Sequence, residues 1–221
     1  MRALVLCCLT CLMVFQPRSA HSCEIALVLA MDVSGSVDAW EYRLQVDGLA
    51  AGLRDPEVRA ALIRGQVALS VVQWSGLGQQ VVSLPWRRML SEAEVDRFAA
   101  RVADMPRTFD RNKTAVGEAI AFAASRFDAV PDCRDRIIDV SGDGAENIGN
   151  TARVESRNAH RAGIVINGLA IEGLTTRVQI TNFYRDFVRT PDGFVETAQT
   201  HLDFARAMRR KLLRELTLPS S

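Results

Sequence analysis

Apolar runs of strand length alternate with stretches of helical periodicity along most of the chain. Residues 24–31 form a nearly continuous apolar run, which is typical of a strand buried on both faces of a parallel sheet. A short polar segment follows at residues 32–36, and Val37, Trp40 and Leu44 then recur at helical spacing. This part of the chain therefore predicts a strand, a polar loop and a helix.

The same alternation continues towards the end of the sequence. It predicts further strands over residues 66–73, 79–84, 136–141, 164–171 and 193–196. It predicts further helices over residues 91–105, 114–127, 151–162, 176–188 and 200–216, and Ser91 with Glu94 forms a capping box for the first of them. The first two of these strands are close enough for a hairpin. Strands that alternate with helices predict an α/β fold, a Rossmann-like, doubly wound, mostly parallel sheet with helices on both faces.

Residues 1–22 have the pattern of a secretory signal. Arg2 precedes an apolar run over residues 3–15, which is shorter than the about 20 residues that a membrane-spanning helix needs. Residues 20–22, Ala-His-Ser, have the small-x-small form of a cleavage site. We therefore expect a signal peptide over residues 1–22, one domain over residues 23–216, a tail over residues 217–221, and an exported protein, periplasmic or secreted. No later stretch of the sequence is long and apolar enough to span a membrane.

Removal of the signal changes the cysteine count. Cys7, Cys8 and Cys11 lie within the apolar signal segment, so that only Cys23 and Cys133 remain. Two cysteines in an exported protein favour one disulfide between them. In the alternative, Cys23 becomes a lipidated N-terminus and the protein is a lipid-anchored envelope scaffold, although residues 20 and 21 match that signal poorly.

Charge and motifs argue against several functions. The chain has 27 basic and 26 acidic side chains with no basic run, so nothing in its charge favours a nucleic-acid partner. Residues 142–147, Gly-Asp-Gly-Ala-Glu-Asn, lack the third glycine of a dinucleotide-binding fingerprint, and the sequence has no phosphate-loop lysine or Gly-x-Ser-x-Gly elbow. No role is assigned to His160 or His201.

Oxygen-bearing side chains follow two predicted strands and open one predicted helix. Asp32, Ser34 and Ser36 follow the first strand, Asp143 follows the strand over residues 136–141, and Thr114 begins a helix. Ligands of open α/β sheets bind beyond the carboxyl ends of the strands. These hard oxygen ligands suit Mg²⁺, with Mn²⁺ or Ca²⁺ as alternatives, whereas Zn²⁺ prefers His or Cys. Five side chains leave a six-coordinate Mg²⁺ with an open position for solvent or for a partner's carboxylate.

This set resembles the metal-ion-dependent adhesion site of von Willebrand factor type A domains. The first loop of that site has the motif Asp-x-Ser-x-Ser, which Asp32, Ser34 and Ser36 match. Its second loop provides a Thr, matched by Thr114 before Ala119-Ile120, and its third loop provides an Asp-Gly pair, matched by Asp143-Gly144. Residues 72–75, 138–144, 166–171 and 210–215 look like a bacterial exported subfamily of that fold whose function is unassigned. The resemblance covers residues 23–216 and implies a non-enzymatic module that binds an unidentified protein through its carboxylate.

The resemblance also bears on the cysteines. The family's topology places the first strand beside the strand over residues 136–141, parallel to it. Cys23 and Cys133 precede Asp32 and Asp143 by nearly equal lengths of chain, so both cysteines fall at the same end of neighbouring strands. Adjacent strands lie about 4.8 Å apart, close to the Cα separation that a disulfide requires.

Simpler explanations exist for single residues. Ser34 or Ser36 could cap the following helix, and Asp110 or Asn112 could contribute in the loop before Thr114. Asp139, in an otherwise apolar strand, needs a partner, for which we expect a structural one such as an Arg. The alternatives in function are a metal-dependent enzyme of phosphoryl-transfer or nucleotide-binding type and the lipid-anchored scaffold.

Overall fold

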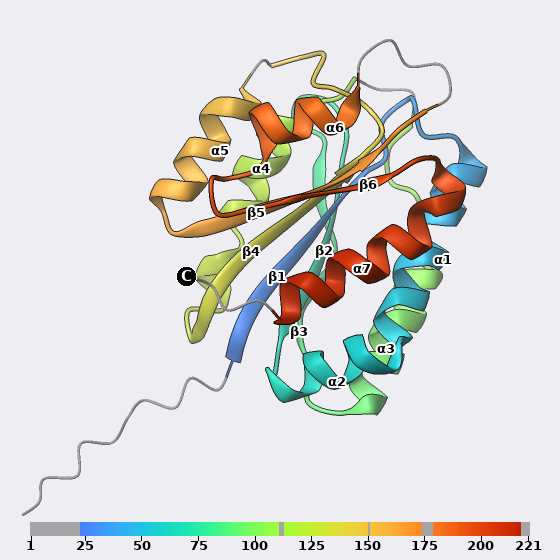
Figure 1. Ribbon diagram of the computed structural model, residues 1–221, viewed down its shortest axis with the longest axis vertical. Helices are drawn as coiled ribbons and strands as arrows, with labels where there is room; N and C mark the ends of the chain where they lie inside the picture. The colour runs from blue at the N-terminus through green and yellow to red at the C-terminus, as the bar shows by residue number, and fades with distance from the viewer. Residues whose placement is uncertain (1–22, 111–112, 150, 174–178, 218–221) are drawn as a thin grey trace, which may run out of the picture.

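A six-stranded sheet runs through the middle of the molecule in the computed structural model, which describes residues 23–110, 113–149, 151–173 and 179–217 (Figure 1). The strand order is β3-β2-β1-β4-β5-β6. The strands are β1 (Cys23–Asp32), β2 (Ala68–Trp74), β3 (Gln80–Arg88), β4 (Cys133–Gly142), β5 (Ile164–Ile171) and β6 (Val195–Ala198). Only the β2–β3 hairpin is antiparallel among these pairings. The expected mostly parallel, doubly wound sheet is confirmed.

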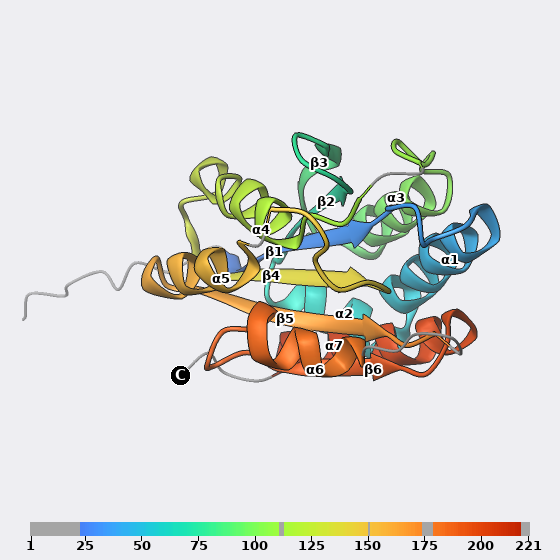
Figure 2. The same cartoon turned by 90° about the horizontal axis from the view of Figure 1, so that it is seen from above.

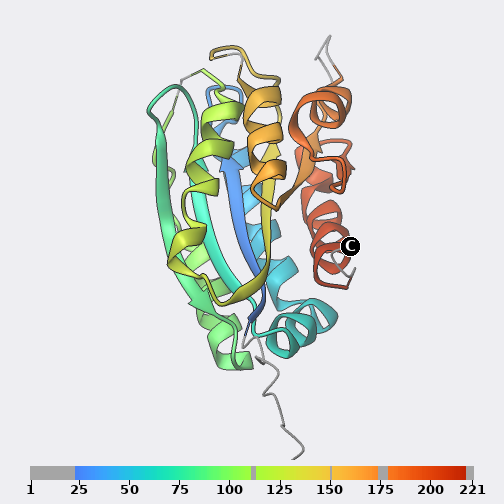
Figure 3. The ribbon, with the colours of Figure 1, turned by 90° about the vertical axis from the view of Figure 1, so that its left-hand side faces the viewer.

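Helices cover both faces of the sheet (Figures 2 and 3). One face carries α1 (Ala39–Arg54), α2 (Pro56–Arg64), α3 (Glu92–Ala103) and α7 (Phe204–Thr217). The other face carries α4 (Val116–Ala124), α5 (Ala152–Arg161) and α6 (Ile180–Phe183). Short helical turns add η1 (Phe127–Ala129), the π-helical η2 (Tyr184–Val188) and η3 (His201–Asp203).

The side chains of β1 divide between two hydrophobic cores. Successive side chains of a strand point to opposite faces, so alternate residues of β1 pack against different helices. The larger ones, Ile25, Leu27, Leu29 and Met31, lie in the core beneath α1, α2, α3 and α7. The smaller ones, Ala26, Val28 and Ala30, lie in the core beneath α4, α5 and α6. Burial on both faces explains why this strand has a continuous apolar sequence.

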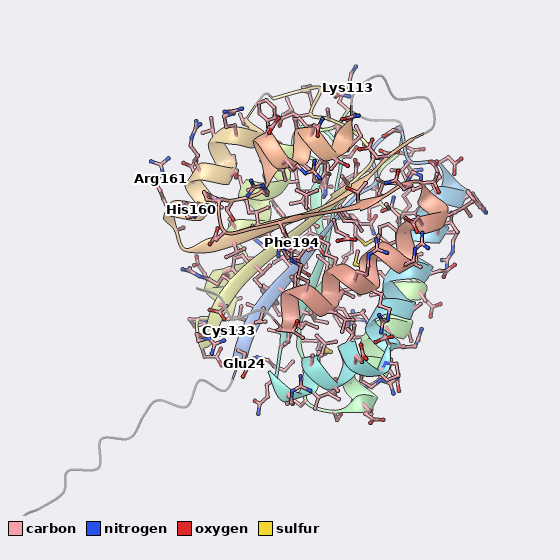
Figure 4. The ribbon with its side chains drawn as sticks, in the orientation of Figure 1. Glu24, Lys113, Cys133, His160, Arg161 and Phe194 are labelled. Atoms are coloured by element: carbon pink, nitrogen blue, oxygen red, sulfur yellow. A yellow bond between two sulfur atoms is a disulfide. The ribbon has the colours of Figure 1, made fainter. Side chains whose placement is uncertain are left out.

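The two central strands place one pair of residues at each end of the sheet. β1 and β4 are neighbours in the sheet. The chain passes from β1 to β2 on one side of this pair and from β4 to β5 on the other side, so the strand order reverses between β1 and β4. Their carboxyl ends carry Asp32 and the Asp143 loop. At the other end Cys23 pairs in register with Cys133, and a disulfide joins them with a Cα–Cα distance of 4.4 Å. Figure 4 shows Cys133 at the opposite end of the molecule from Lys113, which precedes Thr114.

Several predicted helices differ in detail from the structure. Trp40 lies in the first turn of α1 and is 57% exposed, because Tyr42, Val46, Leu49 and Leu53 face the core instead. The helix α2 was missed, although Asp55 caps it and Pro56 begins it, a common start of a helix. The helix predicted over residues 114–127 begins only at Val116, so that Thr114 lies in the loop before it, and it ends at Ala124 and is followed by η1.

Two capping interactions also differ from expectation. Ser91 caps α3 by accepting a hydrogen bond from the Glu94 amide, but the Glu94 carboxylate pairs with Arg97, so that no capping box forms there. The capping box of this fold lies instead at Asp38 and Glu41, at the start of α1. Glu41 is thereby held in a defined position near the carboxyl ends of the strands.

Parts of the predicted organisation lie outside the described residues. These are the signal peptide over residues 1–22, the tail residues 218–221 and residues 176–178 of the helix predicted over residues 176–188. In the described ranges, no helix combines the length and the apolar character needed to cross a bilayer.

Candidate metal site

The loop after β1 is held in a fixed shape by local hydrogen bonds. Asp32 is the last residue of β1, and its Oδ1 accepts a hydrogen bond of 2.7 Å from the Ser34 amide. Arg107 lies across the loop and donates to the carbonyl oxygens of Val33 at 2.9 Å and of Ser34 at 2.8 Å. These hydrogen bonds hold the loop in place at the carboxyl end of β1.

The five residues predicted as metal ligands come together at the carboxyl ends of β1 and β4. Ser34 Oγ lies 3.2 Å from Ser36 Oγ and 3.3 Å from Thr114 Oγ1. Ser36 Oγ in turn donates to Asp143 Oδ1 at 2.5 Å. Hydrogen bonds thus connect three segments that are far apart in the sequence, and Asp32 joins them through the Ser34 amide. That these oxygens bind a metal stays a prediction.

Thr114 is held in place by hydrogen bonds of its own backbone and of the next residue's backbone. Its amide donates to Asn147 Oδ1 at 2.9 Å, and the Asn147 amide donates back to the Thr114 carbonyl at 3.0 Å. The next amide, that of Ala115, donates to the Ser75 carbonyl at 2.9 Å. Of the alternatives in this loop, Asp110 is exposed, and Asn112 lies outside the described residues. These hydrogen bonds bring Thr114 to the site.

Gly142 allows a close approach between β4 and two polar side chains. A Cβ atom at this position would lie 2.8 Å from Asp32 Oδ2 and 2.7 Å from the Tyr184 hydroxyl, closer than real Cβ contacts. Asp32 Oδ2 and the Tyr184 hydroxyl are both buried and have no hydrogen-bond partner among the described residues. A buried carboxylate oxygen without a partner is costly, so its position calls for a bound group.

The electrostatics of the site disfavour two ionised carboxylates without a cation between them. Burial, followed by repulsion from Asp143, raises the pKa of Asp32 to about 7. Burial also raises the pKa of Asp143, against the effects of the Ser36 hydrogen bond and of nearby His201. A divalent cation between these residues would remove the repulsion and replace the lost hydration of both carboxylates.

One side of the oxygen cluster faces solvent. Asp32 and Ser34 are fully buried and Thr114 is 4% exposed, whereas Ser36 is an exposed residue and the side chain of Asp143 is 10% exposed. Any ion held by these oxygens would therefore be accessible from the Ser36 side. This is the arrangement that an open coordination position requires.

Sequence reasoning missed two residues beside the cluster, Glu41 and His201. His201 Nδ1 lies 3.0 Å from Glu41 Oε1, and its Nε2 lies 3.9 Å from Asp143 Oδ2. His201 thus contacts Glu41 and lies close to Asp143, a placement that the sequence analysis did not anticipate. Glu41 and His201 are far apart in the sequence, and neither belongs to a motif with the spacing of metal ligands. The one local signal was the position of Glu41 in the first turn of a helix, where it can complete a capping box.

Asp139 has a structural partner, but the expected type of residue was wrong. Its carboxylate lies 2.7 Å from the ammonium group of Lys211 on α7, which is 2.5 Å from Glu215. Glu215 also accepts a hydrogen bond of 2.8 Å from Asn167 on β5. All four side chains are buried, which makes this a network in the core between the sheet and α7.

The chain matches a known protein family. The family described as "Protein of unknown function (DUF1194)" matches residues 22–220, nearly the whole chain. The chain belongs to this family. No curated protein matches the sequence.

Solved structures show the wider fold relationship. Proximal thread matrix protein 1 from the mussel byssus superposes with a TM-score of 0.67 at 15% identity, over 88% of this chain and 48% of its own. The pilus adhesin SpaC from Lactobacillus rhamnosus GG gives 0.65 at 13%, over 88% and 31%. A von Willebrand factor type A protein from Catenulispora acidiphila gives 0.63 at 15%, over 88% and 43%. The chain thus has the von Willebrand factor type A fold and spans less than half the length of these proteins.

Proposed function

We propose that this protein is an exported, non-enzymatic protein-binding module that acts through a divalent cation. The cation would be held by Asp32, Ser34, Ser36, Thr114 and Asp143, with Mg²⁺ as the expected ion and Mn²⁺ or Ca²⁺ as alternatives. Its open position would accept a carboxylate from an Asp or Glu of another protein. The matched residues are those of the metal-ion-dependent adhesion site that the sequence resembles.

The observation that carries the proposal is the buried Asp32 Oδ2, which lies within a cluster of hard oxygen atoms and has no hydrogen-bond partner in the part of the chain that the structure describes. The residues present fit a divalent cation, because they supply two carboxylates and three hydroxyls, with no sulfur atom among them. Two carboxylates balance the charge of the ion, so a further carboxylate from a partner meets no net negative charge. The ion would attract the carboxylate of the partner protein, and the three loops would hold the ion in place.

Other observations support export and partner binding. The Cys23–Cys133 disulfide is typical of a protein that matures in an oxidising compartment. Among the proteins of similar fold, one is a pilus adhesin, and the mussel protein has also been solved "with zinc occupied MIDAS motif", MIDAS being the metal-ion-dependent adhesion site. Neither enzymatic activity nor lipid anchoring is favoured by a feature of the described residues.

The metal is tested first by thermal unfolding of the purified protein in EDTA, followed by Mg²⁺, Mn²⁺ or Ca²⁺. The wild-type midpoint should rise with metal, because ligands that bind only the folded state stabilise it. Asp143→Ala should lose this rise, whereas Asp128→Asn, an exposed change outside the cluster, should keep it. A wild-type midpoint that does not respond to any of the three ions contradicts the proposal.

Partner binding is tested by affinity capture from an envelope extract. The immobilised wild type should retain one or more proteins in Mg²⁺ and release them in EDTA, and Ser34→Ala should retain none of them. Blocking of acidic side chains in the extract with a carbodiimide and an amine should abolish the capture. Capture that persists in EDTA would argue for a surface that does not use the metal.

A further inference from the structure

A histidine, His201, lies next to the oxygen cluster and has a ring nitrogen that could bind a metal ion. Glu41 from α1, Asp143 from the loop after β4, and His201 from η3 each place one ligand atom within 4.8 Å of the other two. His201 is only 9% exposed, and its Nε2 has no hydrogen-bond partner among the described residues. A buried imidazole nitrogen without a partner needs an explanation in the same way as Asp32 Oδ2 does.

Glu41 determines which nitrogen of the ring is available. One carboxylate oxygen of Glu41 accepts the Asp38 amide hydrogen at 2.8 Å, which anchors the side chain to the start of α1. The other oxygen lies 3.0 Å from His201 Nδ1 and can accept its hydrogen. The neutral ring then carries its free lone pair on Nε2. A carboxylate that orients a histidine in this way is the usual support of a metal-bound imidazole.

The separation between Nε2 and Asp143 fits an ion between them. The distance from His201 Nε2 to Asp143 Oδ2 is 3.9 Å, too long for a hydrogen bond. Bonds from Zn²⁺ to nitrogen and to oxygen are each about 2.0–2.2 Å, so a tetrahedral ion bridges two atoms about 3.4 Å apart and would draw these two side chains together by about 0.5 Å. Water molecules would complete the coordination, since the side chain of Asp143 is partly exposed.

Asp143 presents its two oxygen atoms to different neighbours. Its Oδ1 accepts the hydrogen bond from Ser36 and so faces the oxygen cluster, whereas Oδ2 faces His201. The carboxylate can thus serve one ion with each oxygen. Imidazole nitrogen favours transition-metal ions over Mg²⁺, which prefers oxygen ligands and retains its water.

We propose that His201 Nε2 and Asp143 Oδ2, with Glu41 orienting the ring, form a second cation site that selects a transition-metal ion such as Zn²⁺, Mn²⁺ or Co²⁺. It lies beside the oxygen cluster and shares Asp143 with it. The site goes beyond the proposed function, because it holds whether or not a partner protein binds. An ion there would link α1, the loop after β4 and η3, which leads directly into α7.

Titration with Co²⁺ tests this site, because the visible absorption of Co²⁺ reports its ligands. The purified protein is titrated in the presence of excess Mg²⁺. Wild type should bind Co²⁺, and His201→Gln should bind it at least tenfold more weakly. His160→Gln is the matched control, because His160 is a half-exposed histidine on α5 (Figure 4) and should leave the Co²⁺ affinity unchanged. Equal affinity of wild type and His201→Gln overturns the proposal.

Ser34→Ala separates this proposal from the proposed function. This change removes a hydroxyl from the oxygen cluster, so the response of the thermal midpoint to Mg²⁺ should fall while Co²⁺ binding persists. If the thermal midpoint of wild type responds to none of Mg²⁺, Mn²⁺ and Ca²⁺ but its Co²⁺ binding depends on His201, the proposed function fails and the second site stands. If Mg²⁺ binds and displaces Co²⁺ completely, the two ions share one site and the second site is wrong.

A second measurement uses only the wild-type protein, so that it does not depend on whether a variant folds. Crystals of wild type grown in Mg²⁺ and soaked in Co²⁺ should show anomalous scattering at the cobalt edge, with a peak bonded to His201 Nε2 and Asp143. A cobalt peak confined to the oxygens of the cluster, or a His201 Nε2 hydrogen-bonded to Asp143 without an ion, overturns the proposal.

Discussion

The substitution Asp32→Asn should have opposite effects on stability with and without metal. Without a cation, ionised Asp32 is buried beside Asp143, and its Oδ2 has no partner among the described residues. The neutral amide keeps an oxygen for the Ser34 amide and removes the buried negative charge beside Asp143. We therefore expect the variant to be more stable than wild type in EDTA.

The expected size of this effect follows from the pKa. Burial and Asp143 raise the pKa of Asp32 from 3.8 to about 7. At about 1.4 kcal/mol per pKa unit, an ionised Asp32 costs the metal-free protein about 4 kcal/mol at pH 8. A buried amide has its own cost of about 2 kcal/mol, so the net gain expected for the variant is about 2 kcal/mol. This corresponds to a rise of the midpoint by about 4–8 °C for a chain of this size.

The assay is thermal unfolding at pH 8 in EDTA and in excess Mg²⁺. Metal at about 1,000 times its Kd should stabilise wild type by about 4 kcal/mol and the variant by much less, so the order of stabilities should reverse. Asp128→Asn, the exposed control, should follow wild type in both conditions. A variant less stable than wild type in EDTA would show that the metal-free site does not strain Asp32, which would refute the reasoning.

Three further predictions concern the framework around the site. Replacement of both Cys23 and Cys133 by Ala should lower the free energy of unfolding by about 4 kcal/mol in a urea titration, because the disulfide closes a span of 110 residues; an unchanged urea midpoint would count against that role. Burial raises the pKa of Glu215 to about 7, so the folded state binds this proton more tightly than the unfolded state. Stability should therefore fall by on the order of 3 kcal/mol as the pH rises from about 4.5 to 7, and Glu215→Gln should flatten this part of the pH profile measured by urea unfolding. Gly142→Ala should push apart Asp32 and Tyr184, reduce stability by about 2 kcal/mol and remove the Mg²⁺ response of the thermal midpoint; a variant with a normal response would show that the loop tolerates a Cβ.

Local sequence patterns were sufficient for the architecture and for the membership of the oxygen cluster. The continuous apolar run of β1 reflects burial on both faces, and such a strand occurs at the centre of a parallel sheet. Asp32, Ser34 and Ser36 lie within one short loop, so their proximity depends only on local backbone geometry. Strand order then determines that Asp143 joins them.

Helix faces and boundaries were less predictable, because tertiary contacts decide them. Trp40 fits the helical period of the apolar residues but lies in the first turn of α1, where the sheet does not cover it. Glu94 has the spacing of a capping residue, yet Arg97 competes for its carboxylate. Tertiary packing determines the outcome at Trp40, whereas at Glu94 a competing ion pair within the same helix determines it.

The sequence by itself determined the order of the strands and of most helices, the pair of cysteines and the members of the oxygen cluster, since each depends on residues close together in the chain or on the regular order of an α/β sheet. Only the tertiary structure placed His201 and Glu41 beside Asp143, and only it paired Asp139 with Lys211. These contacts join elements whose relative position results from the packing of α1, η3 and α7 against the sheet. Packing of that kind depends on the whole hydrophobic core and leaves no spacing in the sequence from which it can be deduced.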